Sequence, residues 1–125
     1  MDENEIAKII VNTAFEIHSE LGPGLLESVY KEIMCHELRL SGLEIERQKG
    51  IPVLWNGLEM ELGFRADLIA NKKVIIELKS VETIAPVHYK ILLTYLRLTE
   101  CRLGLLINFN EELIKNGVKR VANNL

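Results

Sequence analysis

The sequence has few of the residues that mark several common classes of protein. Its two cysteines, Cys35 and Cys101, are far apart and have no CxxC or Cys/His spacing, so neither a zinc site nor a disulfide framework is indicated. No apolar run approaches the ~20 residues of a membrane span, and the amino terminus is acidic rather than basic. We therefore expect no signal peptide, no transmembrane helix and no membrane partner. We also expect a cytoplasmic protein in which both thiols are buried and reduced.

Positive charge is also scarce relative to what nucleic-acid binding through bulk electrostatics requires. The chain has 15 lysine and arginine residues against 18 aspartate and glutamate residues, which gives a net charge of -3 at pH 7. Neutralising a phosphate backbone needs clustered lysine and arginine. The charge balance therefore argues against that mode of binding and leaves local contacts open.

What the sequence does contain is typical of a globular domain. At 125 residues, with 48% apolar and 26% charged residues, the chain is long enough for one hydrophobic core and too short for two ordinary domains. We expect a single domain over residues 1–125.

Hydrophobic periodicity and turn residues divide the chain into predicted elements. The patterns indicate helices over 4–21 and 25–40, strands over 44–55, 58–70 and 73–80, a helix over 84–98 and a strand over 103–109, followed by a short, partly basic segment. Gly50 and Pro52 suggest a bulge or an edge position, and Asn56-Gly57 is a strong hairpin signal. The order ααβββαβ predicts an α/β (α+β) fold with a mixed central sheet flanked by helices.

The most informative feature is a pair of acidic residues on two neighbouring strands. Glu77 and Lys79 project from the same face of a strand because side chains alternate. The link over 70–73 is typical of a tight turn, and the antiparallel register that it favours places Asp67 directly opposite Glu77. Opposed like charges destabilise a sheet, and a bound divalent cation would remove the conflict. The alternative is a surface ion pair between Lys79 and Glu77 that contributes little.

Glu27 is the unusual member of the second predicted helix. It shares a helical stripe with Tyr30, Met34 and Leu38, which are aromatic or apolar. The ordinary explanation is a favourable interaction between a carboxylate in the first turn and the helix dipole. If this helix packs beside the strands, Glu27 becomes a candidate third carboxylate at the site of Asp67 and Glu77.

His88 and Tyr95 lie seven residues apart on the third predicted helix and therefore share a face. The commoner fate of such residues is to pack on the sheet with their polar tips at the rim. The functional alternative is that both contact a substrate phosphate or orient a water molecule. His18 and His36 have no comparable partners in the pattern, and we expect both at the surface or its boundary.

Three stretches of the chain carry a family resemblance. They are Gly24-Leu25-Leu26-Glu27-Ser28-Val29-Tyr30, Phe64-Arg65-Ala66-Asp67 and Leu105-Leu106-Ile107-Asn108-Phe109. With Asp67, Glu77 and Lys79 on a hairpin and Glu27 on the preceding helix, the chain resembles the PD-(D/E)XK nuclease superfamily and, more narrowly, the GxxExxY proteins. The resemblance spans nearly the whole chain and implies a restriction-endonuclease-like core.

The resemblance also implies a chemistry. Asp67 and Glu77 would hold a divalent metal, Mg²⁺ or Mn²⁺, with help from Glu27, and Lys79 would activate water or support the attacking oxygen. Hard cations such as Mg²⁺ prefer carboxylate and water ligands. The implied activity is hydrolysis of phosphodiester bonds in DNA or RNA. The alternative is a catalytically silent relative that binds nucleic acid or assembles with itself as a homo-oligomer.

The third helix departs from the family pattern at one position. The family usually carries a glutamine four residues before its tyrosine, and this chain has Ile91 there with Tyr95 retained. Isoleucine can neither donate nor accept a hydrogen bond. We expect Ile91 to face the site rather than solvent.

Overall fold

The computed structural model describes residues 1–61 and 65–125. The helices are α1 (Glu3–Leu21), α2 (Glu27–Leu40), α3 (Pro86–Thr99) and the short 3₁₀ helix η1 (Ile114–Asn116). The strands are β1 (Ile45–Gly50), β2 (Val53–Trp55), β3 (Leu58–Met60), β4 (Arg65–Ala70), β5 (Val74–Lys79), β6 (Leu103–Asn108) and β7 (Val118–Ala122). Each predicted helix is present within two residues of its expected bounds, and Pro86 opens α3 as its first-turn residue.

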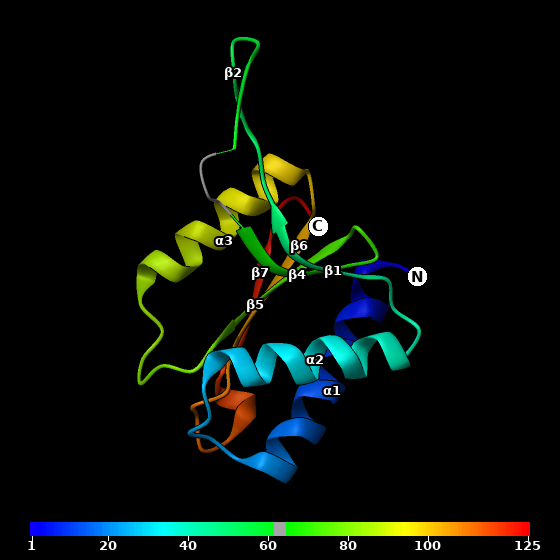
Figure 1. The fold of residues 1–125 in the computed structure, drawn as a ribbon, viewed down its shortest axis with the longest axis vertical. Coiled ribbons are helices and arrows are strands. Elements are labelled where there is room, and N and C mark those ends of the chain that lie inside the picture. Colours follow the sequence, from blue (N-terminus) through cyan, green and yellow to red (C-terminus); the bar gives the residue numbers. More distant parts are fainter. Residues whose placement is uncertain (62–64) are drawn as a thin grey trace.

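Five strands form a mixed sheet in the order β1-β4-β5-β6-β7 (Figure 1). Strands β5 and β6 are parallel and are joined by α3, whereas the other neighbouring pairs are antiparallel. Strands β2 and β3 form a separate two-stranded hairpin. The predicted mixed sheet flanked by helices is therefore confirmed.

Helices cover both faces of the five-stranded sheet (Figure 1). Helices α1 and α2 pack on one face, where the core includes Ile76 and Leu78 of β5. Helix α3 packs on the other face, where the core includes Ile75 and, on the helix, Leu92. Because β5 is apolar on both faces and lies between β4 and β6, burying it removes more apolar surface from water than burying an edge strand would.

The turn between β4 and β5 sets the register of the two strands. Asn71 and Lys72 both have positive φ, 50° and 57°, and the Lys73 amide donates to the Ala70 carbonyl oxygen at 2.9 Å. A turn with two left-handed central residues matches the twist of a hairpin. The pairs Leu68↔Ile76, Ile69↔Ile75 and Ala70↔Val74 follow from it. These three pairs have the register predicted from the sequence, but the predicted pair of Asp67 with Glu77 is not among them.

Two strand predictions need correction. The strand expected over 58–70 is divided into β3 and β4, and residues 62–64, which include Phe64 of the family motif, lie outside the described residues. The short, partly basic carboxy-terminal segment, for which no strand was predicted, contains β7, which pairs with β6 as the edge of the sheet. The break at Gly50 and Pro52 and the hairpin at Asn56-Gly57 are both present; the latter two residues have φ of 46° and 85°.

Three further expectations concern buried groups and the membrane. Cys35 and Cys101 are free and buried, as predicted. His18, expected at the surface or its boundary, is buried, with Nε2 2.7 Å from the carbonyl oxygen of Glu111. Among the described helices, none is long and apolar enough to cross a bilayer.

Candidate active site

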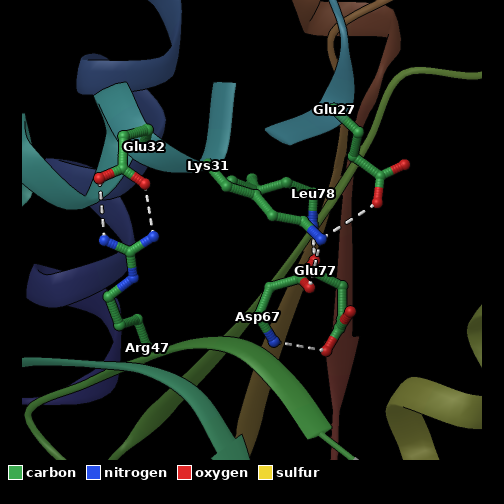
Figure 2. Close-up of polar contacts among 7 residues, drawn as sticks. All are labelled: Glu27, Lys31, Glu32, Arg47, Asp67, Glu77 and Leu78. Atoms are coloured by element: carbon green, nitrogen blue, oxygen red, sulfur yellow. Dashed lines mark hydrogen bonds and ion pairs between the residues drawn. The ribbon is translucent and has the colours of Figure 1, made fainter. Parts of the chain in front are cut away.

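Asp67 and Glu77 are joined at the end of the β4–β5 hairpin. The Asp67 amide donates to Oε1 of Glu77 at 3.2 Å, and the Leu78 amide donates to Oδ2 of Asp67 at 2.8 Å (Figure 2). Alternation from Ile76 and Leu78 places Glu77 on the face of the sheet that α3 covers. The neighbours of Asp67, Ala66 and Leu68, belong to the cores on opposite faces, and the Asp67 carboxylate contacts Lys31 of α2 rather than α3. The two acidic residues are therefore joined through backbone amides of the strands and not as a pair of side chains on one face.

Burial makes this arrangement electrostatically unusual. Glu77 is only 7% exposed. Burial and, secondly, the charge of Asp67 raise the pKa of Glu77 to about 8, against the lowering effects of the hydrogen bond from the Asp67 backbone and of the charge of Lys79. Without a cation, Glu77 therefore holds its proton at neutral pH. A buried acid in this state is a common feature of functional sites.

A lysine that the sequence analysis did not single out lies between two of the predicted site residues. Nζ of Lys31 on α2 is 2.9 Å from Oδ1 of Asp67 and 3.3 Å from Oε1 of Glu27 (Figure 2). Burial lowers the pKa of Lys31, but the hydrogen bonds and charges of Asp67 and Glu27 outweigh it, and the net pKa is raised. Lys31 is therefore a charged ammonium group held by both carboxylates.

The tyrosine of the GxxExxY stretch has a structural role in this arrangement. The Tyr30 hydroxyl donates to the Gly22 carbonyl oxygen at 2.6 Å and accepts from the Leu25 amide at 3.2 Å. Its ring stacks on Phe109 with centroids 4.4 Å apart. Tyr30 thus fixes the loop that leads into α2, and with it the first-turn position of Glu27.

The same loop is tied to the end of β5. The Phe109 amide donates to the Lys79 carbonyl oxygen at 2.8 Å, and Oγ of Ser80 donates to the Leu25 carbonyl oxygen at 2.7 Å. Fully buried Asn108, which pairs with Lys79 across the parallel strands, holds the chain beyond it. Its side chain bonds both the amide and the carbonyl of Val81, at 3.1 and 2.8 Å. The sequence signal for this role of Asn108 was its position as a polar residue within the apolar run of β6.

Of the two substrate-binding candidates on α3, Tyr95 lies near the acidic pair and His88 caps the helix. Burial and, secondly, the charge of Glu77 raise the pKa of buried Tyr95, and Asp67 adds to the effect. Nδ1 of His88 accepts from the Ala85 amide at 3.0 Å, an N-terminal capping contact. Substrate binding by either residue stays a prediction. Ile91 is 39% exposed, so the expectation that it is turned away from solvent is wrong.

The fit to a metal can be judged from the donor atoms. Among the described residues, no three histidine, cysteine, aspartate or glutamate side chains are grouped so that they could hold a metal ion. The expected convergence of Glu27, Asp67 and Glu77 on one point is absent from this conformation because the Lys31 ammonium separates Glu27 from Asp67. The chemistry nevertheless fits a hard cation, since all three donors are carboxylates and a cation, Lys31, already lies against two of them.

The sequence model of the PD-(D/E)XK nuclease superfamily matches residues 4–121. The chain belongs to this superfamily. Comparison with curated proteins and with solved structures gives no significant match. Membership supports a nuclease-like function with a nucleic-acid substrate in a superfamily whose nucleases generally depend on divalent metals. The narrower likeness to GxxExxY proteins stays a prediction.

Proposed function

We propose that this protein is a metal-dependent nuclease that hydrolyses phosphodiester bonds in DNA or RNA. The observation that carries the proposal is the Asp67–Glu77 pair. Each carboxylate accepts a hydrogen bond from a backbone amide of the other residue's strand, and Glu77 retains its proton because it is buried and lies near the charge of Asp67. A folding argument gives no reason to keep a buried acid beside a second acid, because burying a carboxyl group and bringing like charges close together both cost free energy.

Asp67 and Glu77 are the residues that would hold Mg²⁺ or Mn²⁺, and Glu27 would join them once Lys31 withdraws. When bound, the cation would polarise a phosphoryl oxygen and lower the pKa of water. The Lys31 ammonium, released from Asp67, would then be available to pair with a substrate phosphate. In this exchange, the negative charge of Asp67 is offset by Lys31 without metal and by the cation when metal is bound.

Lys79 is the candidate for the water-activating or charge-stabilising group. It lies two residues beyond Glu77 on β5, and its charge acts on that carboxylate. The contacts of Phe109 and Asn108 described above fix its backbone. A lysine held there can orient the attacking oxygen or stabilise negative charge that develops in the transition state.

The test is a cleavage assay on single- and double-stranded DNA and RNA with Mg²⁺ or Mn²⁺. We expect metal-dependent cleavage by wild type and a loss on the order of 100-fold or more in Asp67→Asn and in Lys79→Ala. Lys8→Ala is the control, because Lys8 is an exposed lysine on α1. Cleavage that survives Lys79→Ala would identify a contaminating nuclease. Retained nucleic-acid binding without cleavage would instead support the catalytically silent alternative.

A further inference from the structure

The β2–β3 hairpin stands apart from the rest of the molecule. Within the described residues, its two strands pair with each other and with no other strand, and Figure 1 shows the hairpin projecting from the body. None of its described residues belongs to either hydrophobic core, although Ile51, just before β2, is buried in one of them. The hairpin is therefore anchored at its root and open to solvent at its tip.

One face of this hairpin is entirely apolar. The register is Val53↔Met60, Leu54↔Glu59 and Trp55↔Leu58. Because side chains alternate along a strand, Val53, Trp55, Leu58 and Met60 share one face, and Leu54 and Glu59 share the other. Trp55 is 68% exposed and Leu58 is 56% exposed, while Val53 and Met60 nearer the root are half-buried. We call these four residues the apolar hairpin face.

An uncovered face of this kind is costly for an isolated hairpin. Two strands alone are marginally stable in water and normally need a third strand or a packed layer. Exposing tryptophan and leucine side chains also gives up the free energy gained by burying large apolar groups. An exposed apolar face of this kind is expected on a hairpin that a binding partner covers.

We infer that the apolar hairpin face binds the same face of a second copy of this chain. The charge of the hairpin argues against nucleic acid as the partner. Residues 51–61 contain Glu59 and Glu61 and no lysine or arginine, so the hairpin offers nothing to neutralise a phosphate backbone. In a pairing of like faces, Glu59 lies on the outer side with Leu54, and no like charges meet.

The shape of the face also suits a two-fold pairing. Its exposed residues are at the tip and its half-buried residues are near the root, so two hairpins that run in opposite directions would place each Trp55 over the partner's Val53 and Met60. Four side chains cover only a few hundred Å², roughly, which is less than the ~800 Å² per partner of a stable interface. The dimer should therefore dissociate on dilution.

Trp55 provides a direct reporter because it is the only tryptophan in the chain. Sedimentation velocity and tryptophan emission are measured on the full chain over a concentration series. We expect a dimer at high concentration whose emission is blue-shifted and protected from acrylamide. On dilution, the emission should shift to the red in parallel with the appearance of monomer.

A matched pair of variants separates the two faces of the hairpin. Leu58→Asn removes an apolar group from the apolar hairpin face and should raise the dimer dissociation constant about tenfold or more, as expected near the centre of an interface. Leu54→Asn makes the same chemical change on the opposite face, at 68% exposure, and should leave the constant unchanged. Circular dichroism on both variants checks that the fold is retained.

The proposal does not rest on the nuclease assignment, and Asp67→Asn should dimerise as wild type does. A monomer at all concentrations with solvent-exposed Trp55 emission would overturn it. So would quenching of Trp55 by a single-stranded oligonucleotide on a protein that stays monomeric, which would assign the face to nucleic-acid bases. Equal effects of Leu54→Asn and Leu58→Asn would also overturn it, because the contact would then not be specific to one face.

Discussion

The Lys31 ammonium lies 2.9 Å from Oδ1 of Asp67, so a positive charge from α2 is already present at the acidic end of the β4–β5 hairpin. The side chains of both residues are largely withdrawn from solvent, with exposures of 23% and 12%. This contact offsets negative charge at that end of the hairpin in the metal-free protein and places a competitor at the proposed cation site. The first prediction follows from that dual role.

Replacing Lys31 by methionine should lower stability in chelator and increase the stabilising effect of Mg²⁺. The unfolding free energy without metal should fall by about 1 to 2 kcal/mol, because Asp67 and Glu27 lose a partly buried partner. Metal should recover more stability in the variant than in wild type, since the competing ammonium is gone. Urea unfolding with and without Mg²⁺ measures both effects, with Lys8→Met as the control. Unchanged values in Lys31→Met would refute the competition.

Wild-type stability in chelator should fall as pH rises from about 4.5 to about 8, the ordinary and folded-state pKa values of Glu77. In that window the folded state binds more protons than the unfolded state, so its advantage is complete at low pH and is lost as pH passes the folded pKa. The slope approaches about 1.4 kcal/mol per pH unit when one proton separates the states. Urea unfolding at several pH values measures it.

Glu77→Gln should flatten this pH profile and stabilise the protein at pH 8, because the amide carries no charge to bury. Asp67→Asn should behave differently, since it also gives up the attraction to Lys31. Glu20→Gln, an exposed residue of α1, is the control for removing a carboxylate. Parallel profiles for wild type and Glu77→Gln would show that Glu77 titrates normally.

Tyr30→Phe should cost about 1 to 2 kcal/mol of stability and reduce metal-dependent cleavage. The phenyl ring can still stack on Phe109, but the Gly22 carbonyl oxygen and the Leu25 amide lose their partner, and the loop before Glu27 loosens. Thermal unfolding and cleavage assays well below the melting temperature separate the two effects. Cleavage at the wild-type rate by a destabilised variant would show that the position of Glu27 does not matter for the reaction.

Ile91→Gln should increase cleavage several-fold with little change in stability. The side chain is already 39% exposed, so the substitution removes little packing. One additional hydrogen bond that is better formed in the transition state is worth about 1 kcal/mol. Val87→Gln, one turn earlier on α3 and 51% exposed, is the matched control. An equal increase in both variants would point to a general effect of surface polarity.

Local chemistry explains which parts of the fold could be predicted. Asn56-Gly57 and Asn71 impose left-handed backbone at two turns, and Pro86 suits a helix start, so these features appear directly in the sequence. Strand β7 was missed because it is a short, half-exposed edge strand without a clear apolar alternation. An edge strand forms mainly through its pairing with the neighbouring strand, and the local sequence of β7 does not predict its pairing with β6.

The site was predictable only where its residues are close in sequence. Asp67 and Glu77 are ten residues apart across one turn, so the sequence could place them near each other, although the strand pairing ends at Leu68 and Ile76. Lys31 looks like an ordinary helical partner of Glu27, four residues earlier, and its contact with Asp67 depends on how α2 packs over the sheet. Asn108 is missed for the same reason, because its partner Val81 is brought near by the parallel pairing of β5 and β6.

The β4–β5 turn has a consequence for how this domain can change over evolutionary time. Asn71 is bonded on both sides to Glu44, its amide donating to the Glu44 carbonyl and its side-chain oxygen accepting from the Glu44 amide, each at 2.8 Å. Inserting a single residue into this turn would shift β4 against β5 by one position, so the Asp67 amide would no longer meet Oε1 of Glu77 and the Leu78 amide would no longer meet Oδ2 of Asp67. The Asn56-Gly57 turn of the separate β2–β3 hairpin can lengthen without changing these contacts. The β4–β5 turn cannot, so its length should be among the least variable features in descendants that keep the same chemistry.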